Sequence, residues 1–418
     1  MAAIGLLLLG GLLRVAASAT VGLNRVDSLK LALARSLTLD PQHPSRLFLY
    51  WGEGLAPVGL QLLKGLDGGG HLLWLRLPWI LAGTATLALL YGLVRQTLGR
   101  PQALLATFLL AVDQFHVTWT RMFSAEILAM GLEVAVLWAL WQGLTAPHRQ
   151  FRWFLLVGIL LATAYHVKMA SLLLLLGLGV YLLALRRPLG LRRIPPRALA
   201  VAVTAFSALI LPTVLWIARH PMDNPAVYRR LTILEPGPHF PLTPVALYLA
   251  GVARGWRRRR EPFVALLLTV FSTISLFYAA FSAPGMNHYW WPYFGLIPAI
   301  VLAADLLAAL WQRARGTRIV VLGLCGYLAI HLVAPLAARG QDYPAYSPQT
   351  WTVLQVESGL EAMAQERFSH AYAHFLWASK LDPANAPLHA WLVEAYTQAC
   401  HQKKLGRSSG DPTDDLLP

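Results

Sequence analysis

Ionisable residues at the ends of long apolar stretches are the first candidates for chemistry in this sequence. Arg76, Arg121, Glu126 and Lys168 lie at such ends, and Asp27 follows the first apolar stretch. A charged side chain is costly in lipid, so one that lies at membrane depth marks a candidate functional site. Cations can stabilise negative charge that develops in a reaction, and a carboxylate that faces water can accept a proton.

Each of these residues also has a purely structural interpretation. Asp27 could be a solvated carboxylate that pairs with Arg25 or Lys30. Long basic side chains near a membrane interface often extend their charged ends toward the lipid headgroups. Arg121 could simply form an ion pair with Glu126.

The composition indicates a membrane protein. Of the 418 residues, 56% are hydrophobic and only 13% are charged, whereas globular domains contain about 25% charged residues. The formal charge of +15 does not indicate nucleic-acid binding, because the arginines form short clusters between apolar runs. Cys325 and Cys400 have no evident partners, so neither a disulfide framework nor a metal site is predicted.

The apolar runs predict an all-α polytopic fold with about eleven transmembrane helices. A run of about 18 residues or more can cross the hydrocarbon core as a helix. The expected spans are Ala3–Val21, Leu73–Val94, Ala103–Trp119, Ile127–Leu144, Trp153–His166, Ala170–Leu185, Ala198–Ile217, Pro244–Val252, Phe263–Phe281, Trp291–Trp311 and Ile319–Ala337.

Five arginine clusters, which occur in every second short loop, predict the orientation. Because cytoplasmic loops carry the excess of basic residues, the N-terminus is expected in the cytoplasm. The segment 22–72 and the tail from Arg339 are then periplasmic or extracellular. An alternative is that Ala17-Ser18-Ala19 ends a cleaved signal peptide, which would not change the sidedness downstream.

The external segment 22–72 contains two amphipathic stretches. The residues from Asn24 to Arg35 place apolar side chains at helical spacing, as in a helix that lies at a membrane interface. The second stretch, Leu47–Leu66, contains Glu53 and Pro57.

In its motifs, the membrane part (1–338) resembles the GT-C membrane glycosyltransferases of the protein O-mannosyltransferase and aminoarabinose-transferase type. Asp27 lies where family members carry an acidic residue after the first span, although Ser28 stands in place of the usual glutamate. The other similar segments are Leu12-Leu13-Arg14, Ala56-Pro57-Val58-Gly59-Leu60, Leu75-Arg76-Leu77-Pro78, Phe115 to Arg121 with Glu126, Ala164-Tyr165-His166-Val167-Lys168, and Asn287-His288-Tyr289-Trp290-Trp291-Pro292.

The resemblance implies an inverting glycosyltransferase that moves a sugar from a polyprenyl-phosphate donor to a lipid, glycan or protein acceptor on the exoplasmic face. Asp27 would be the catalytic base. The residues implied in substrate binding are Arg76, Arg121, Glu126, Lys168, His288, Tyr289 and Glu53. Asp113 is expected to pair with a cation on a neighbouring helix rather than to react.

The cofactor is unknown from the sequence. Glu53 and Asp27 could share a divalent cation, since such ions prefer carboxylate ligands, but no ligand spacing supports a metal site. Two other functions stay open. One is a transporter or flippase for a lipid-linked sugar, and the other is a catalytically inactive scaffold that binds a protein partner through its tail.

The tail (339–405) resembles a tetratricopeptide repeat followed by half of a second repeat. Gly359, Ala371, Phe375, Ala378 and Pro383 keep the offsets of the first repeat, and Leu392 and Tyr396 fit the helix that begins the next. Such a short array rarely stands alone, so we expect it to pack on the membrane part or on a protein partner. Residues 406–418 are expected to be disordered.

Overall fold

The computed structural model describes residues 2–16, 72–121, 124–168, 171–185, 194–219, 242–281 and 291–337, and parts of 356–404. All regular elements in these ranges are helices. In chain order they are α1 (Ala2–Val15), α5 (Leu72–Thr97), α6 (Arg100–Val112), α7 (Gln114–Thr120), α8 (Ala125–Thr145), a 3-10 turn (Pro147–Arg149), α9 (Gln150–Val167), α10 (Leu172–Val180) with a π-helical end (Tyr181–Leu185), α11 (Pro196–Arg219), α13 (Leu242–Arg257), α14 (Pro262–Phe281), α15 (Trp291–Arg313), α16 (Arg315–Ala337), α18 (Phe368–Leu381) and α19 (Ala386–Lys404).

The all-α fold class predicted from the apolar runs is confirmed, and each expected span coincides with at least one helix. In the described part of the chain, five helices are long and apolar enough to cross a membrane. They are Arg76–Thr97, Ala125–Thr145, Gln150–Val167, Pro196–Leu215 and Gly295–Arg313, and four shorter helices are also apolar. The total of eleven crossings stays a prediction.

The third expected span, Ala103–Trp119, is not one continuous helix, and this prediction is wrong. The chain leaves helical geometry at Asp113, whose φ of −66° and ψ of 118° are extended. The Asp113 side chain accepts a hydrogen bond from the backbone N–H of His116, so it caps the short helix α7. A carboxylate that can satisfy a free N–H at this position favours a new helix start over continuation of α6.

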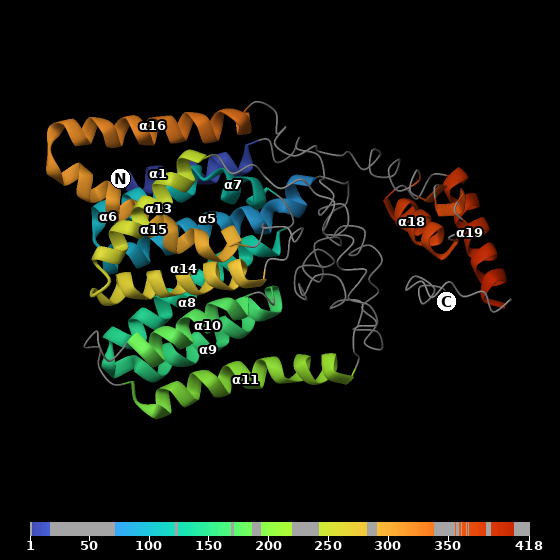
Figure 1. Cartoon of the computed structure of the whole chain (residues 1–418), viewed down its shortest axis with the longest axis horizontal. Coiled ribbons are helices and arrows are strands. Elements are labelled where there is room, and N and C mark those ends of the chain that lie inside the picture. The colour runs from blue at the N-terminus through green and yellow to red at the C-terminus, as the bar shows by residue number, and fades with distance from the viewer. Residues whose placement is uncertain are drawn as a thin grey trace.

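The described helices of the membrane part lie side by side, with α11 and α16 at opposite edges (Figure 1). Helix α11 packs mainly against α9, whereas α16 packs against α15 and contacts α6 and α7. The outward face of α11 carries the exposed apolar residues Leu199, Val203, Leu211 and Val214. In a membrane this face meets lipid, so its exposure is consistent with a bundle that spans the bilayer.

Small residues allow the closest helix contacts. A side chain on Gly251 of α13 would lie 2.5 Å from the backbone nitrogen of Ala303 on α15. A side chain on Gly158 of α9 would lie 2.3 Å from the carbonyl oxygen of Ala202 on α11. Close backbone approach of this kind is how helices associate in lipid, where no hydrophobic effect drives them together.

The tail forms a small core of its own from α18, α19 and a few residues before them. Ala371, Phe375, Ala378, Leu388 and Ala395 are buried in this core. A side chain on Gly359 would overlap the Phe375 ring at 2.5 Å, so only glycine allows this contact. The packing is compatible with the tetratricopeptide-like offsets, but the assignment as a repeat stays a prediction.

The Gly251–Ala303 contact leads to a stability prediction. We expect Gly251→Ala to lower the melting temperature of the detergent-solubilised protein, because the added methyl group would push α13 away from the α15 backbone. The matched control is Gly323→Ala on α16, where nothing lies within 4 Å of the added carbon. The control should be neutral or slightly stabilising, since alanine is favoured over glycine in helices by about 1 kcal/mol. Equal effects of the two changes would contradict this account of the α13–α15 contact.

Candidate functional site

Arg14, near the end of α1, is fully buried among α1, α6 and α7. Its guanidinium donates to the carbonyl oxygens of Gly10 (2.7 Å) and Leu110 (3.2 Å). It also donates to Nδ1 of His116, at 2.6 Å. Since lipid offers no hydrogen-bond partners, these contacts hold α1 against the junction of α6 and α7.

The contact with Arg14 also determines the tautomer of His116. A guanidinium can only donate, so Nδ1 of His116 accepts and Nε2 carries the proton. His116 is fully buried, and its Nε2 has no hydrogen-bond partner among the residues that the structure describes. The imidazole is therefore held in one orientation by α1.

Asp113 connects α7 to α13. One carboxylate oxygen accepts the His116 backbone N–H at 2.8 Å, and the other accepts the Tyr248 hydroxyl at 3.0 Å. Asp113 was expected to pair with a cation on a neighbouring helix. It does lie within electrostatic reach of Arg14 on α1, but its hydrogen bonds include those from the His116 amide and the Tyr248 hydroxyl, and none of these comes from a cation. Asp113 therefore connects α7 to α13 through hydrogen bonds.

Arg121, directly after α7, holds the end of α1. Its Nε and Nη2 donate to the carbonyl oxygen of Ala16 at 3.0 and 2.5 Å. The carbonyls at a helix C-terminus carry partial negative charge and have no partner within the helix, so a cation there is stabilising. Arg121 therefore sets the point where the chain leaves α1 for the segment that contains Asp27.

Glu126 and Lys168 form a buried ion pair that joins the start of α8 to the end of α9. Lys168 Nζ lies 2.7 Å from Glu126 Oε1, and the two side chains are 2% and 7% exposed. The other glutamate oxygen accepts the Ser124 hydroxyl at 2.8 Å. Lys168 itself ends α9, with its backbone in an extended conformation. The pair thus places a cation and a carboxylate together at one end of the bundle.

Arg76 lies on α5 at this same end and is fully buried. Gly83, two helical turns along the same face of α5, is the residue that approaches Arg14 and Thr120. Arg76 is therefore farther toward the end of the bundle at which Arg121, Glu126 and Lys168 lie. Asp27, Glu53, His288 and Tyr289 lie outside the described residues, and so does the cation site considered for Asp27 and Glu53.

The sequence did not identify His116 and Tyr248 as parts of this polar network, and Arg14 was noted only within the family-like segment Leu12-Leu13-Arg14. An arginine within an apolar run was the available signal, because such a residue is costly without partners. Tyr248 could not be found this way, since a tyrosine in a span is ordinary.

Glu133 is a second residue that the sequence reasoning missed. It lies on α8 two turns beyond Glu126, on the same face, and is 1% exposed. Neither of its carboxylate oxygens has a hydrogen-bond partner among the described residues. In these residues no group of three or more histidine, cysteine, aspartate or glutamate side chains could hold a metal ion.

The geometry defines a polytopic helical membrane protein with a cluster of buried charges at one end. Residues 60–216 match the protein family described as dolichyl-phosphate-mannose-protein mannosyltransferase. None of the curated proteins matches this chain in sequence.

Solved structures share the fold. ArnT from Cupriavidus metallidurans has a TM-score of 0.57 and 17% identity, over 94% of this chain and 76% of ArnT. The same protein bound to undecaprenyl phosphate matches with a TM-score of 0.54 and 17% identity, with the same coverage. The oligosaccharyltransferase of Archaeoglobus fulgidus has a TM-score of 0.55 and 14% identity, over 85% of this chain but only 57% of its own length. The fold that the resemblance to the GT-C membrane glycosyltransferases implies is therefore confirmed.

The buried pair yields a prediction on stability. Lys168→Met should lower the free energy of unfolding in detergent by about 3–5 kcal/mol, because it leaves a buried carboxylate without its counter-charge. The double change Glu126→Leu with Lys168→Met should recover most of this loss, since it removes both charges. Additive losses in the double-mutant cycle would show that the two side chains are not coupled.

Glu133 yields the opposite prediction. Glu133→Leu should raise the free energy of unfolding in detergent by about 1–3 kcal/mol, because the acid is buried without a described hydrogen-bond partner. Glu126→Leu is the matched control on the same face of α8, and it should destabilise the protein. A loss of stability in Glu133→Leu as well would contradict this account of Glu133.

Proposed function

We propose that this chain is an inverting glycosyltransferase that uses a polyprenyl-phosphate-linked sugar. The single observation that carries the proposal is that four charged residues are buried at the same end of the bundle, namely Arg76, Arg121 and the ion pair of Glu126 and Lys168. The family match over residues 60–216 and the fold shared with ArnT bound to undecaprenyl phosphate support it.

In this proposal, Arg76 and Lys168 hold the donor phosphate at the lipid boundary. A phosphate that leaves as an anion is stabilised by fixed cations, which need little reorganisation during the reaction. Lys168 is already oriented by Glu126, so its charge is kept at this end of α9 when no donor is bound. Glu126 thus has a positioning role.

Asp27 is the proposed base. Its carboxylate takes the proton from an acceptor hydroxyl, and the hydroxyl oxygen attacks the anomeric carbon of the donor sugar. The bond between that carbon and the phosphate oxygen breaks, and the polyprenyl phosphate leaves. A single displacement of this kind inverts the configuration at the anomeric carbon.

Arg121 helps to place Asp27 by fixing the end of α1, from which the chain continues to Asp27. It holds the carbonyl of Ala16, and Asp27 follows eleven residues later. The departure point of the segment 22–72 is therefore at the same end as the cationic residues. We also propose that this end faces the periplasm or the extracellular space, with the N-terminus in the cytoplasm, because the arginine clusters are at the other end.

The proposal predicts that binding and transfer can be separated by substitution. Asp27→Asn should bind undecaprenyl phosphate as the wild type does, and should lose sugar transfer from a panel of synthetic polyprenyl-phosphate sugars. Arg76→Gln should weaken undecaprenyl-phosphate binding roughly tenfold, because one charge-assisted contact to the phosphate is lost. Binding is measured by ligand-induced thermal stabilisation, and transfer by mass spectrometry of the product.

Arg95→Gln, on the same helix but at the other end, is the matched control and should change neither quantity. Full transfer by Asp27→Asn would refute the catalytic role of Asp27. A carrier would be favoured over an enzyme by two results together. The wild type would show no sugar transfer, and the flux of a lipid-linked sugar across the proteoliposome membrane would be the same in Asp27→Asn as in the wild type.

A further inference from the structure

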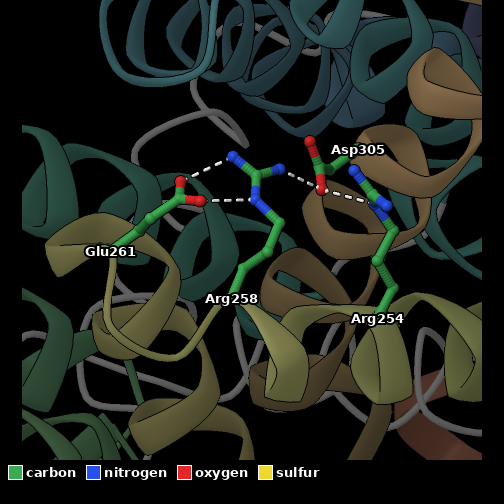
Figure 2. Close-up of polar contacts among 4 residues, drawn as sticks. All are labelled: Arg254, Arg258, Glu261 and Asp305. Carbon is green, nitrogen blue, oxygen red and sulfur yellow. Dashed lines mark hydrogen bonds and ion pairs between the residues drawn. The ribbon is translucent and has the colours of Figure 1, made fainter.

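A four-residue ionic cluster closes the turn between α13 and α14 (Figure 2). Asp305 of α15 is 2% exposed and accepts Arg254 Nε at 3.0 Å, and it also pairs with Arg258 Nη1. Arg258 donates twice to Glu261, at 2.6 and 2.5 Å. Hydrogen bonding to Glu261, together with the interaction with Asp305, raises the pKa of the Arg258 guanidinium, so this residue stays charged.

Within this cluster, both nearby carboxylates, Glu261 and Asp305, are already paired with Arg254 or Arg258. Three further arginines, Arg257, Arg259 and Arg260, are exposed at the same turn, and none forms an ion pair with a carboxylate among the described residues. The turn therefore presents three uncompensated positive charges on a rigid base.

An apolar strip leads to these charges. Leu249, Ala253 and Trp256 share one face of α13, at spacings of four and three residues, and Arg259 and Arg260 follow in the turn after the helix. Leu249 is 56% exposed and Trp256 is 58% exposed. The Arg259 guanidinium lies over the Trp256 ring, 5.6 Å from its centre, which orients both groups. A neighbouring turn repeats the pattern, with Arg318 over the Trp311 ring at 5.9 Å.

The whole end of the bundle is strongly basic. In the described part of the membrane domain, thirteen arginines lie at this end, and the only carboxylates there are Glu261 and Asp305. The arginines are Arg95, Arg100, Arg149, Arg152, Arg197, Arg254, Arg257, Arg258, Arg259, Arg260, Arg313, Arg315 and Arg318. A field of this sign attracts anions, and clusters of basic residues next to a transmembrane helix favour anionic lipids.

We propose that the face formed by Leu249, Trp256, Arg257, Arg259 and Arg260 binds an anionic phospholipid. The three arginines contact the headgroup phosphate, Trp256 lies at the level of the headgroups, and an acyl chain follows Leu249 along α13. A soluble phosphate or a nucleic acid would match the arginines but would leave the apolar strip uncovered. The combination of a charged end with a continuous apolar strip matches a phospholipid.

The test uses the full-length protein in mixed micelles that contain phosphatidylglycerol and phosphatidylcholine with identical acyl chains. Native mass spectrometry measures which lipid the protein retains. We expect the wild type to prefer phosphatidylglycerol, and we expect Arg257→Gln/Arg259→Gln/Arg260→Gln to reduce this preference roughly tenfold. This variant leaves Arg254 and Arg258 in place, so the ionic cluster that holds the turn is retained.

The matched control is Arg95→Gln/Arg100→Gln/Arg152→Gln, which removes the same charge from the same end and should keep the wild-type preference. An equal loss in both variants would mean that general surface charge, and not this face, selects the lipid, and would overturn the proposal. Displacement of phosphatidylglycerol by inorganic phosphate or by a short RNA would also overturn it. A melting temperature equal to that of the wild type confirms that the variant is folded.

Discussion

A buried arginine on the first helix organises the end of the bundle where the candidate site lies. Arg14 is inaccessible to water, and lipid cannot satisfy its donors, so protein groups must do so. The carbonyls of Gly10 and Leu110 and the ring of His116 supply these contacts. Helix α1 can come this close to α5, and α5 this close to α7, because Gly10 and Gly83 have no side chains. At each position an added carbon would lie within 2.3 Å of a neighbouring side chain.

The second constraint on this end of the bundle is Asp113, whose carboxylate lies near the positive charge of Arg14. An extended residue within a transmembrane segment leaves free backbone groups, which are costly in lipid unless side chains satisfy them. Asp113 satisfies the amide of His116 and receives the hydroxyl of Tyr248, while the positive charge of Arg14 lies nearby. The short helix α7 can therefore turn its end toward α1, where Arg121 reaches the carbonyl of Ala16.

The two ends of the bundle differ in their chemistry. At one end, charged side chains are buried, and the ion pair between Glu126 and Lys168 preserves the geometry of both. At the other end, arginines are numerous and most of the described ones are exposed, and the ion pairs among the described residues are those of Arg254 and Arg258 with Asp305 and Glu261. Buried, oriented charges suit the binding of one reacting phosphate, whereas exposed arginines beside Trp256 suit contact with the headgroup of an anionic phospholipid.

The sequence by itself determined the solvent, the fold class and the order of the helices. The reason is that long apolar runs interrupted by arginine clusters are compatible with few structures other than membrane-spanning helices. It also indicated Arg76, Arg121, Glu126 and Lys168 as candidate site residues, because ionisable residues at membrane depth are costly.

Only the tertiary structure decided that Lys168 pairs with Glu126, that Arg121 caps α1, and that Asp113 breaks a span that reads as continuous. These outcomes depend on which helices are neighbours in space, and a hydropathy pattern carries no information about contacts between residues such as Arg14 and His116, which are about a hundred positions apart in the chain.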